Sequence, residues 1–504
     1  MDNGFIGIQE QPVAGQPDTA LTDAQVLTKK GDDAYDRQDY AEAVKCYSKA
    51  AEQGYACAQF NLGNRYYNGE GVEQDYTKAA EWYCKGAEQG NAVAQLFLGN
   101  CYYNGEGVEQ DKAKAVEWYR KAAEQGHAKA QRNLGNCYDS DGSVTQDKAK
   151  AVEWYRNVAE QGVAVAQFKL GNCYYDGEGV TQDKAKAVEW YRKAAGQGDA
   201  CAQFNLGYCY YNGEGVEKDY AKAVEWYSHA AEQGVTIAQV DLGYCYYNGE
   251  GVEQDYAKAV EWYRKAAEQG HAGAQFGLGI CYYNGEGVAQ DKAKAAEWYN
   301  KAGEQGNAVA QFKLGYCYDS GEGVMQDKAK AVEWYRKAAE QGYVRAQFNL
   351  GVCYFNGAGV EQDYTKAAEW YRKAAEQGNA DAQLFFGNCY FNGKGVMRDY
   401  AKAVEWYYKA AEQGNAGAQF SLGYCYDNGA GVEQDYVQAV EWYFKAAEQD
   451  DADAQYYLGD CYFNGEGVAQ DYAKALEWYS KAAAQGHEMA QGILDTKKEH
   501  LAEN

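Results

Sequence analysis

The chain has 504 residues and a formal net charge of −26, which arises from 74 acidic and 48 basic side chains. Proteins that bind nucleic acids need clustered lysine and arginine to replace phosphate counterions. The sequence has no such cluster and no apolar run of about 18 residues, the length that a membrane-spanning helix needs. We therefore expect neither a nucleic-acid partner nor a membrane span.

The first 20 residues contain both prolines of the chain, Pro12 and Pro17, and show no periodicity. We interpret residues 1–20 as a disordered tail. This segment lacks the basic start and the long apolar core of a signal peptide, which favours a cytoplasmic protein. A secreted protein, or one of the ER lumen, is the alternative.

Residues 21–54 are expected to form a helical hairpin that caps the chain. Its loop is short, because DRQDY stands where the next unit has NGEGVEQDY. A short-looped hairpin of this kind resembles a tetratricopeptide repeat.

Residues 55–486 consist of a 36-residue unit that occurs twelve times. A fixed period of this length predicts a solenoid in which each unit contacts only its neighbours. Residues 487–504 begin a further unit, become charged and have no second helix after them. We expect them to form a C-terminal capping helix.

The unit is represented by residues 91–126, NAVAQLFLGNCYYNGEGVEQDKAKAVEWYRKAAEQG. Ala94, Leu98 and Cys101 are spaced i, i+4 and i+7, which places them on one face of an α-helix. Asn91 is expected to cap the start of this first helix. The segment NGEG ends it, because glycine tolerates the positive φ of such turns.

A second helix follows in each unit. Asp111 is the expected N-cap, and Ala115, Trp118 and Tyr119 again have helical spacing. Gly126 is expected to end the helix in the left-handed conformation. The sequence thus predicts an all-α solenoid of stacked helix–turn–helix repeats.

These residues resemble the Sel1-like repeat, a family related to the tetratricopeptide repeats, over about residues 55–500. The resemblance implies a right-handed α/α superhelix that acts as a scaffold or adaptor for protein complexes. The matching positions in the unit shown are Ala92, Ala94, Gln95, Leu98, Gly99, Tyr102, Gly105, Gly107, Val108, Asp111, Lys114, Ala115, Trp118, Tyr119, Lys121, Ala122, Ala123 and Gly126.

Two departures from the family matter. The loop at residues 140–144 reads SDGSV in place of NGEGV and is expected to be distorted. One branch of the family has paired cysteines in each repeat and is linked to β-lactam binding. That pairing is absent here, so hydrolase or penicillin-binding activity is an alternative by family analogy only.

The cysteines offer no case for chemistry. Eleven of the 15 recur at one repeat position, from Cys101 to Cys461, without the close pairs or histidines of a zinc site. We expect them to fill small buried spaces as apolar side chains. No set of nucleophile, base and orienting residue stands out, so we expect a non-enzymatic protein with no metal and no cofactor.

The positions that differ between nearly identical copies indicate where a partner binds. One variable stripe lies on the first helix at the phases of Val93, Phe97 and Asn100, away from Ala94 and Leu98. In solenoids of helix pairs the first helices line the concave surface, so this stripe is the candidate groove. Neutral drift at exposed positions is the alternative. The candidate groove residues are Asn61, Asn64, Phe97, Asn100, Asn133, Asn136, Lys169, Asn172, Asn205, Tyr208, Asp241, Tyr244, Ile280, Lys313, Tyr316, Asn349, Val352, Phe385, Asn388, Tyr424, Tyr457 and Asp460.

The expected function is that of a monomeric, non-catalytic scaffold that binds one or more proteins or peptides along this groove. Asparagines in the early repeats suit an extended peptide backbone, and the later tyrosine, isoleucine and valine suit apolar side chains. A secreted or surface-exposed binder at a host or cell-wall interface is the alternative.

Overall fold

The computed structural model describes residues 21–139 and 147–502, with side chains up to residue 495. The described residues form α-helices joined by turns and loops, with no β-strand among them. The chain divides into two compact units. The N-terminal unit ends at Ala238 and also contains residues 250–252, and the C-terminal unit contains residues 239–249 and the chain from Glu253 onward.

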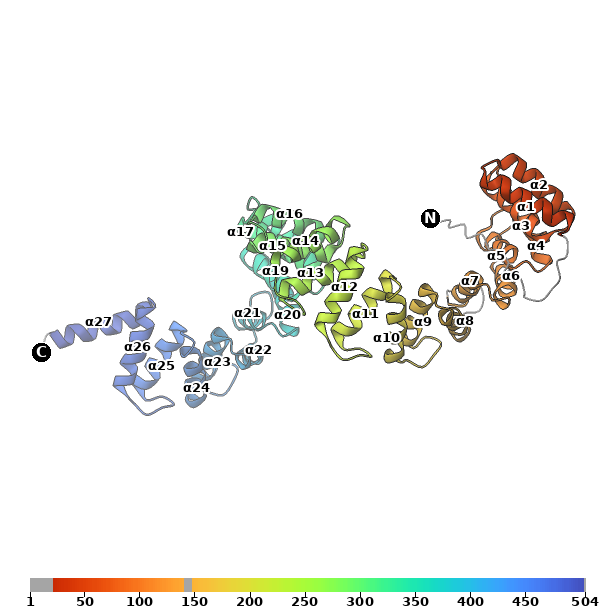
Figure 1. Cartoon of the computed structure of the whole chain (residues 1–504). Helices are drawn as coiled ribbons and strands as arrows, with labels where there is room; N and C mark the ends of the chain where they lie inside the picture. The colour runs from red at the N-terminus through yellow and green to blue at the C-terminus, as the bar shows by residue number, and fades with distance from the viewer. Residues whose placement is uncertain (1–20, 140–146, 503–504) are drawn as a thin grey trace. The chain divides into compact units, whose positions relative to one another are not determined.

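The N-terminal unit is a stack of antiparallel helix pairs (Figure 1). Its helices are α1 Asp23–Asp36, α2 Tyr40–Glu52, α3 Ala56–Asn68, α4 Tyr76–Glu88, α5 Ala92–Asn104, α6 Lys112–Glu124, α7 Ala128–Asp139, α8 Lys148–Glu160, α9 Ala164–Asp176, α10 Lys184–Ala195, α11 Ala200–Asn212 and α12 Tyr220–Glu232.

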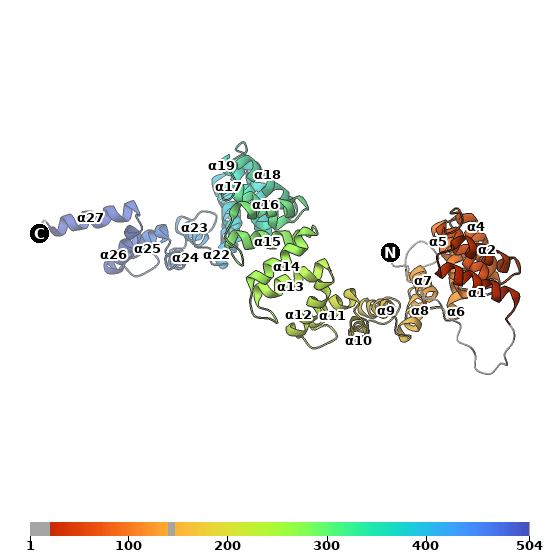
Figure 2. The same cartoon turned by 45° about the horizontal axis from the view of Figure 1, so that its top comes forward.

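The helix α13 Thr236–Asn248 spans the boundary between the units. The C-terminal unit repeats the same helix pair, and consecutive pairs lie side by side in both views (Figure 2). Its further helices are α14 Tyr256–Glu268, α15 Ala272–Asn284, α16 Lys292–Glu304, α17 Ala308–Ser320, α18 Lys328–Glu340, α19 Val344–Asn356, α20 Tyr364–Glu376, α21 Ala380–Asn392, α22 Tyr400–Glu412, α23 Ala416–Asn428, α24 Tyr436–Ala447, α25 Ala452–Asn464, α26 Tyr472–Ala484 and α27 Glu488–Ala502.

The expected helix ends are confirmed in the representative unit. The Asn91 side chain accepts a hydrogen bond from the Ala94 N–H, and the Asp111 side chain accepts one from the Lys114 N–H. Gly105 ends α5 with a φ of 80°, and Gly126 follows α6 with a φ of 84°. This unit therefore folds as the predicted pair of capped helices.

Close packing of the two helices depends on a glycine opposite a tyrosine. A Cβ atom added at Gly99 of α5 would lie 2.6 Å from the ring of Tyr119 on α6. Tyr119 is buried, as are Leu98 and Cys101 on the facing side of α5. Val108 from the loop packs against the same core. The all-α solenoid is thus confirmed within each unit.

A buried glutamine joins each first helix to two second helices. Gln95, 4% exposed, donates from Nε2 to the Ala87 carbonyl at the end of α4, and its Oε1 accepts from Gln125 after α6. The two distances are 3.1 and 2.8 Å. The same pair of bonds recurs at Gln59, Gln131, Gln167, Gln203, Gln275, Gln311, Gln347, Gln383, Gln419 and Gln455.

Two predictions lie outside the described residues: the disordered tail at residues 1–20 and the distorted loop at 140–144. The division into residues 21–54, 55–486 and 487–504 stays a prediction.

Candidate functional site

The candidate groove residues lie on the odd-numbered helices from α3 to α25, at the phases of Phe97 and Asn100 in α5; α15 and α23 contribute one each, Ile280 and Tyr424, and the other helices two. We call these two phases the middle and third positions, and together they form the first-helix face. Residues on α3–α11 belong to the N-terminal unit, and the candidates from Asp241 onward belong to the C-terminal unit. The structure brings neighbouring copies together within a unit, but it does not gather the whole set into one site.

Most of these side chains are half-buried. At the third position, Asn64 is buried, and the exposed ones are Asn136, Tyr208, Tyr244 and Tyr316. All middle-position side chains are half-buried. The face is therefore partly engaged in packing and partly open to a partner.

The asparagines at the third position accept hydrogen bonds from inside the fold. The hydroxyl of Tyr119 on α6 donates to Asn100 Oδ1 at 2.8 Å, and Tyr407 on α22 donates to Asn388 Oδ1 at 2.7 Å. The same bond joins Tyr83 to Asn64, Tyr155 to Asn136 and Tyr191 to Asn172. These bonds were not predicted, although a tyrosine follows each asparagine by 19 residues.

Two asparagines at the middle position extend this network between repeats. Asn133 Nδ2 donates to Asn100 Oδ1 at 3.3 Å, and Asn205 Nδ2 donates to Asn172 Oδ1 at 3.2 Å. In the first of the twelve repeats, the Asn61 side chain donates instead to the Asp32 carboxylate on α1. The side-chain carbonyl oxygens of these third-position asparagines thus already accept hydrogen bonds from within the chain.

The third position loses this acceptor in part of the C-terminal unit. Val352 stands where Asn would accept, and the hydroxyl of Tyr371 is buried without a hydrogen-bond partner among the described residues. Tyr371 is 0% exposed. Leaving a buried hydroxyl unpaired costs about 1–3 kcal/mol. Valine at residue 352 is thus unfavourable for the fold itself.

Aromatic residues at the middle position wedge against the preceding repeat. Phe97 lies 5.2 Å from Phe60 and 5.5 Å from Tyr83 between ring centroids. Phe385 lies 5.5 Å from both Phe348 and Tyr371. Such ring pairs stabilise the joint beyond the area they bury.

A cavity of about 280 Å³ opens on the face in the N-terminal unit. Its lining consists of Tyr175, Tyr191, Phe204, Asn205 and Tyr208, so it contains two predicted groove residues. The walls are mainly aromatic, and Asn205 supplies a polar edge. A pocket of this size and lining accepts an apolar or aromatic side chain.

The charged candidates differ in environment. Burial raises the pKa of the Asp241 carboxyl to about 6. Lys313 lies with Nζ 5.9 Å from the ring centroid of Tyr283. Ile280 and Val352 pack against the core, and Asn349 and Lys169 are half-buried.

Contacts between the loop of one repeat and the first helix of the preceding repeat were not predicted from the sequence. Tyr67 on α3 donates to Glu106 in the following loop at 2.8 Å, and Tyr247 donates to Glu286 at 2.6 Å. Where the tyrosine becomes Phe355, the loop carboxylate becomes Lys394, whose Nζ lies 5.0 Å from the phenyl centroid. This paired replacement of tyrosine by phenylalanine and of glutamate by lysine can be seen in the sequence, where the two positions lie 39 residues apart.

The repeated thiols are structural, as predicted. Cys101 through Cys461 at the shared position are buried, and burial raises the pKa of Cys209 to about 12. Over the described residues, no cluster of three or more potential metal ligands occurs. In the same part of the chain, no helix combines the length and apolarity of a bilayer span.

The family model for the Sel1 repeat matches the sequence over residues 29–55, 58–91, 92–127, 128–163, 164–199, 202–235, 236–271, 272–307, 308–343, 344–379, 380–415, 416–451 and 452–487. No curated protein matches the chain.

Two of the solved structures that are similar to this chain share its family and cover most of its length. A protective antigen present in uropathogenic Escherichia coli strains, which displays an SLR fold, is 41% identical with a TM-score of 0.76, over 89% of this chain and 97% of that one. A Sel1 repeat protein from Oxalobacter formigenes is 37% identical with a TM-score of 0.51, over 65% of this chain and 92% of that one.

Proposed function

Because the chain belongs to the Sel1 repeat family, we propose that it is a non-catalytic scaffold that holds protein partners against its first-helix face. Proteins of this family generally mediate protein–protein interactions. The partners are one or more proteins or peptides, and the scaffold itself is a monomer.

The observation that carries this proposal is the loss of the acceptor at Val352. Asparagine at this position would pair the hydroxyl of Tyr371, as Asn388 pairs that of Tyr407. The chain instead places valine at residue 352, and the preceding repeat presents a 40% exposed tyrosine at residue 316. Features that reduce stability are concentrated at functional sites, so these residues serve a bound partner.

The chemistry of the face fits a protein surface. Tyrosine is enriched at protein interfaces because it combines a large apolar ring with a hydroxyl. Tyr208 at the cavity in the N-terminal unit, and Tyr244 and Tyr316 in the C-terminal unit, present such rings to solvent. The net charge of −26 opposes nucleic-acid binding.

Affinity capture on the immobilised full chain tests the proposal. We expect the substitutions Tyr208→Ala, Tyr244→Ala and Tyr316→Ala together to deplete the specifically captured proteins. The matched control replaces Tyr76, Tyr400 and Tyr472 with Ala, because these tyrosines are similarly exposed but begin second helices. Equal capture by both triple variants, with unchanged circular dichroism, would contradict the proposal.

We propose a cytoplasmic location, supported by a chain rich in cysteines that are for the most part buried, because thiols persist in reducing compartments. A surface-exposed binder is the second candidate, since a structure 41% identical is described as a protective antigen. Fractionation of the native cells, followed by protease treatment of intact cells, separates the two locations.

A further inference from the structure

The last repeats of the C-terminal unit present an aromatic surface on the first-helix face. Tyr457 on α25 has its ring centroid 6.1 Å from Tyr424 on α23 and 5.5 Å from Phe420. Tyr443 on α24 stacks beneath Tyr457 at 5.5 Å. Tyr424 and Tyr457 are half-buried, so each ring is held by its neighbours and still has a part exposed to solvent. We call Tyr424, Tyr457, Asp427 and Asp460 the C-terminal subsite.

The first helices at this end carry acidic residues without basic ones. Helices α21, α23 and α25 contain Asp381, Asp427, Asp453 and Asp460 but no lysine or arginine. Other first helices do carry basic residues, as at Lys313 on α17 and Arg345 on α19. The subsite therefore combines aromatic rings with two carboxylates and has no lysine or arginine on its own helices, while His487 lies 3.3 Å from the neighbouring Asp453.

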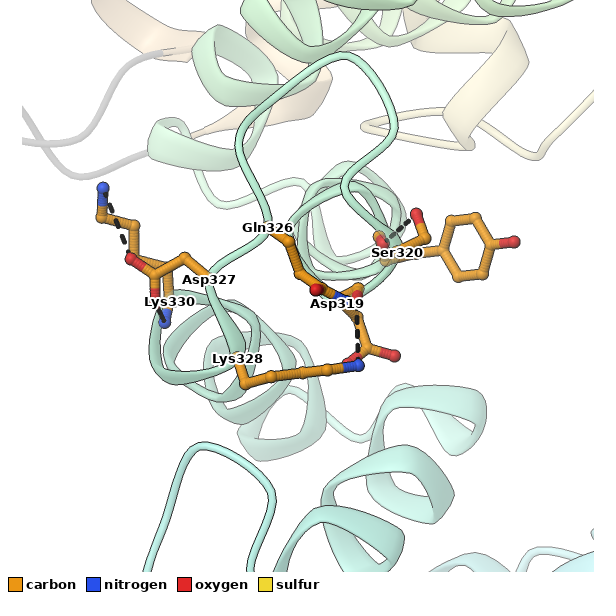
Figure 3. Close-up of polar contacts among 7 residues, drawn as sticks. Asp319, Ser320, Gln326, Asp327, Lys328 and Lys330 are labelled. Atoms are coloured by element: carbon orange, nitrogen blue, oxygen red, sulfur yellow. Dashed lines mark hydrogen bonds and ion pairs between the residues drawn. The ribbon is translucent and has the colours of Figure 1, made fainter.

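The lack of a nearby lysine is clearest at Asp427 when this residue is compared with the equivalent residues of other repeats. The same position holds Asp139 and Asp319, and each pairs with the lysine nine residues later. Lys148 Nζ lies 3.6 Å from Asp139, and Lys328 Nζ lies 2.7 Å from Asp319 (Figure 3). After Asp427 the ninth residue is Tyr436, so the internal counter-ion is missing.

Asp460 carries a charge that its structural role does not need. It stands at the third position and accepts the Tyr479 hydroxyl at 2.6 Å, just as the neutral Asn388 accepts Tyr407 at 2.7 Å. Burial raises the pKa of Asp460, and Glu466 adds to the rise while His487 opposes it. Burial also raises the pKa of Asp427, with Glu466 and Asp460 adding to the rise and the Tyr443 hydroxyl opposing it.

We propose that the C-terminal subsite docks a lysine or arginine side chain of a protein partner. The aliphatic stem lies on the rings of Tyr424 and Tyr457, and the charged end lies between Asp427 and Asp460. Cations are attracted to the faces of tyrosine rings, and hydrogen bonds between ionised groups are the stronger kind. The subsite deepens the proposed scaffold function, on which it rests, by fixing the chemistry of one partner segment.

The probe is a short fluorescein-labelled peptide of alternating lysine and glycine, measured against the purified full chain by fluorescence anisotropy. Peptides with acetyl-lysine or glutamate in place of lysine are the charge controls. We expect the lysine peptide alone to bind, and the double variant Asp427→Asn, Asp460→Asn to weaken it about tenfold or more. Asparagine keeps the acceptors for Tyr443 and Tyr479, so the fold is preserved.

Two single substitutions separate a built subsite from general charge attraction. Tyr436→Lys restores the missing counter-ion without touching the subsite, and lysine already begins α18 in the same position. We expect Tyr436→Lys to weaken binding of the lysine peptide as strongly as the double variant does. Asp319→Asn is the matched control, because Lys328 already neutralises that carboxylate, and it should leave the affinity unchanged.

Absence of lysine-peptide binding, unchanged affinity in Tyr436→Lys, or an equal loss in Asp319→Asn would each overturn the inference. These outcomes leave the scaffold function standing, because that function is tested separately by capture with the tyrosine variants. Conversely, equal capture by the two tyrosine triple variants would contradict the scaffold function without altering the peptide result.

Discussion

A buried tyrosine hydroxyl in each second helix connects the core of a repeat to its variable face. Where the third position is asparagine, as at Asn388, the hydroxyl is paired; where it is valine, as at Val352, the hydroxyl is not. A single side chain therefore sets both the local stability and the surface offered to a partner.

The first prediction compares the two kinds of hydroxyl. Tyr371→Phe removes an unpaired buried hydroxyl and should raise the free energy of unfolding by about 1 kcal/mol or more. Tyr407→Phe removes a hydroxyl that is bonded to Asn388 and should lower it by about 1 kcal/mol. Urea unfolding followed by tryptophan fluorescence measures both. Equal destabilisation by the two variants would show that the Tyr371 hydroxyl has a partner.

The second prediction concerns pH. The pKa of Asp241 is about 6 in the folded chain, above its ordinary 3.8, so the folded state holds this proton more tightly than the unfolded state. Its contribution to stability is present below about pH 4 and is lost as the pH rises through about 6. Asp241→Asn should therefore raise the urea midpoint at about pH 8 and leave it unchanged near pH 4. A gain of equal size at both pH values would rule out this cause.

What the sequence could predict at the residue scale was limited by spacing. Repetition identified the positions that vary, including Phe97, Asn100 and Tyr316, because differences stand out against near-identical copies. It did not reveal that Asn100 accepts from Tyr119, since that bond depends on how two helices are placed in space. The chemistry of the face therefore emerged only from the structure.

At the scale of the element, the helix pair was predicted well. The caps at Asn91 and Asp111 and the left-handed glycines Gly105 and Gly126 are local features whose residue types determine the backbone. The loop contacts were not predicted. The bond from Tyr67 to Glu106 joins separate units, and a period gives no information about how far one unit reaches into another.

Two glycines that both have a positive φ should differ sharply in the stability that is lost when each is replaced by alanine. Gly270 and Gly287 have φ of 90° and 71°, so both variants lose about 1 kcal/mol from left-handed strain. Only at Gly287 would the new Cβ meet the Tyr256 carbonyl oxygen, at 2.2 Å, whereas at Gly270 nothing lies within 4 Å. Gly287→Ala should lose about 1–3 kcal/mol more. Thermal unfolding by circular dichroism compares them, and equal losses would mean that the loop yields freely.

At the scale of the whole molecule, contacts are predominantly local. In each unit the main packing joins a helix to the helix before it and the helix after it. Stability in such an array is approximately a sum of terms for each repeat and each joint. Unfolding is therefore expected to be graded along the chain instead of all-or-none.

Hydrogen exchange measured by mass spectrometry should show this locality. In Gly287→Ala, the added exchange should be greatest in α14, α15 and α16 and should decline toward α26. Gly270→Ala serves as the control for strain alone. A uniform rise over every helix of the C-terminal unit would indicate that the unit opens as one cooperative body.

The buried glutamine that joins three helices has a consequence for how such a chain can change over generations. Because Gln95 and its counterparts make the same two bonds in copy after copy, this part of the junction is the same wherever a second helix is followed by a first helix. A recombination event between two copies in the gene adds or removes whole multiples of 36 codons and keeps the glutamine bonds at every remaining junction. The length of this protein can thus change over generations in steps of whole repeats, whereas the glutamine bonds at its junctions stay the same.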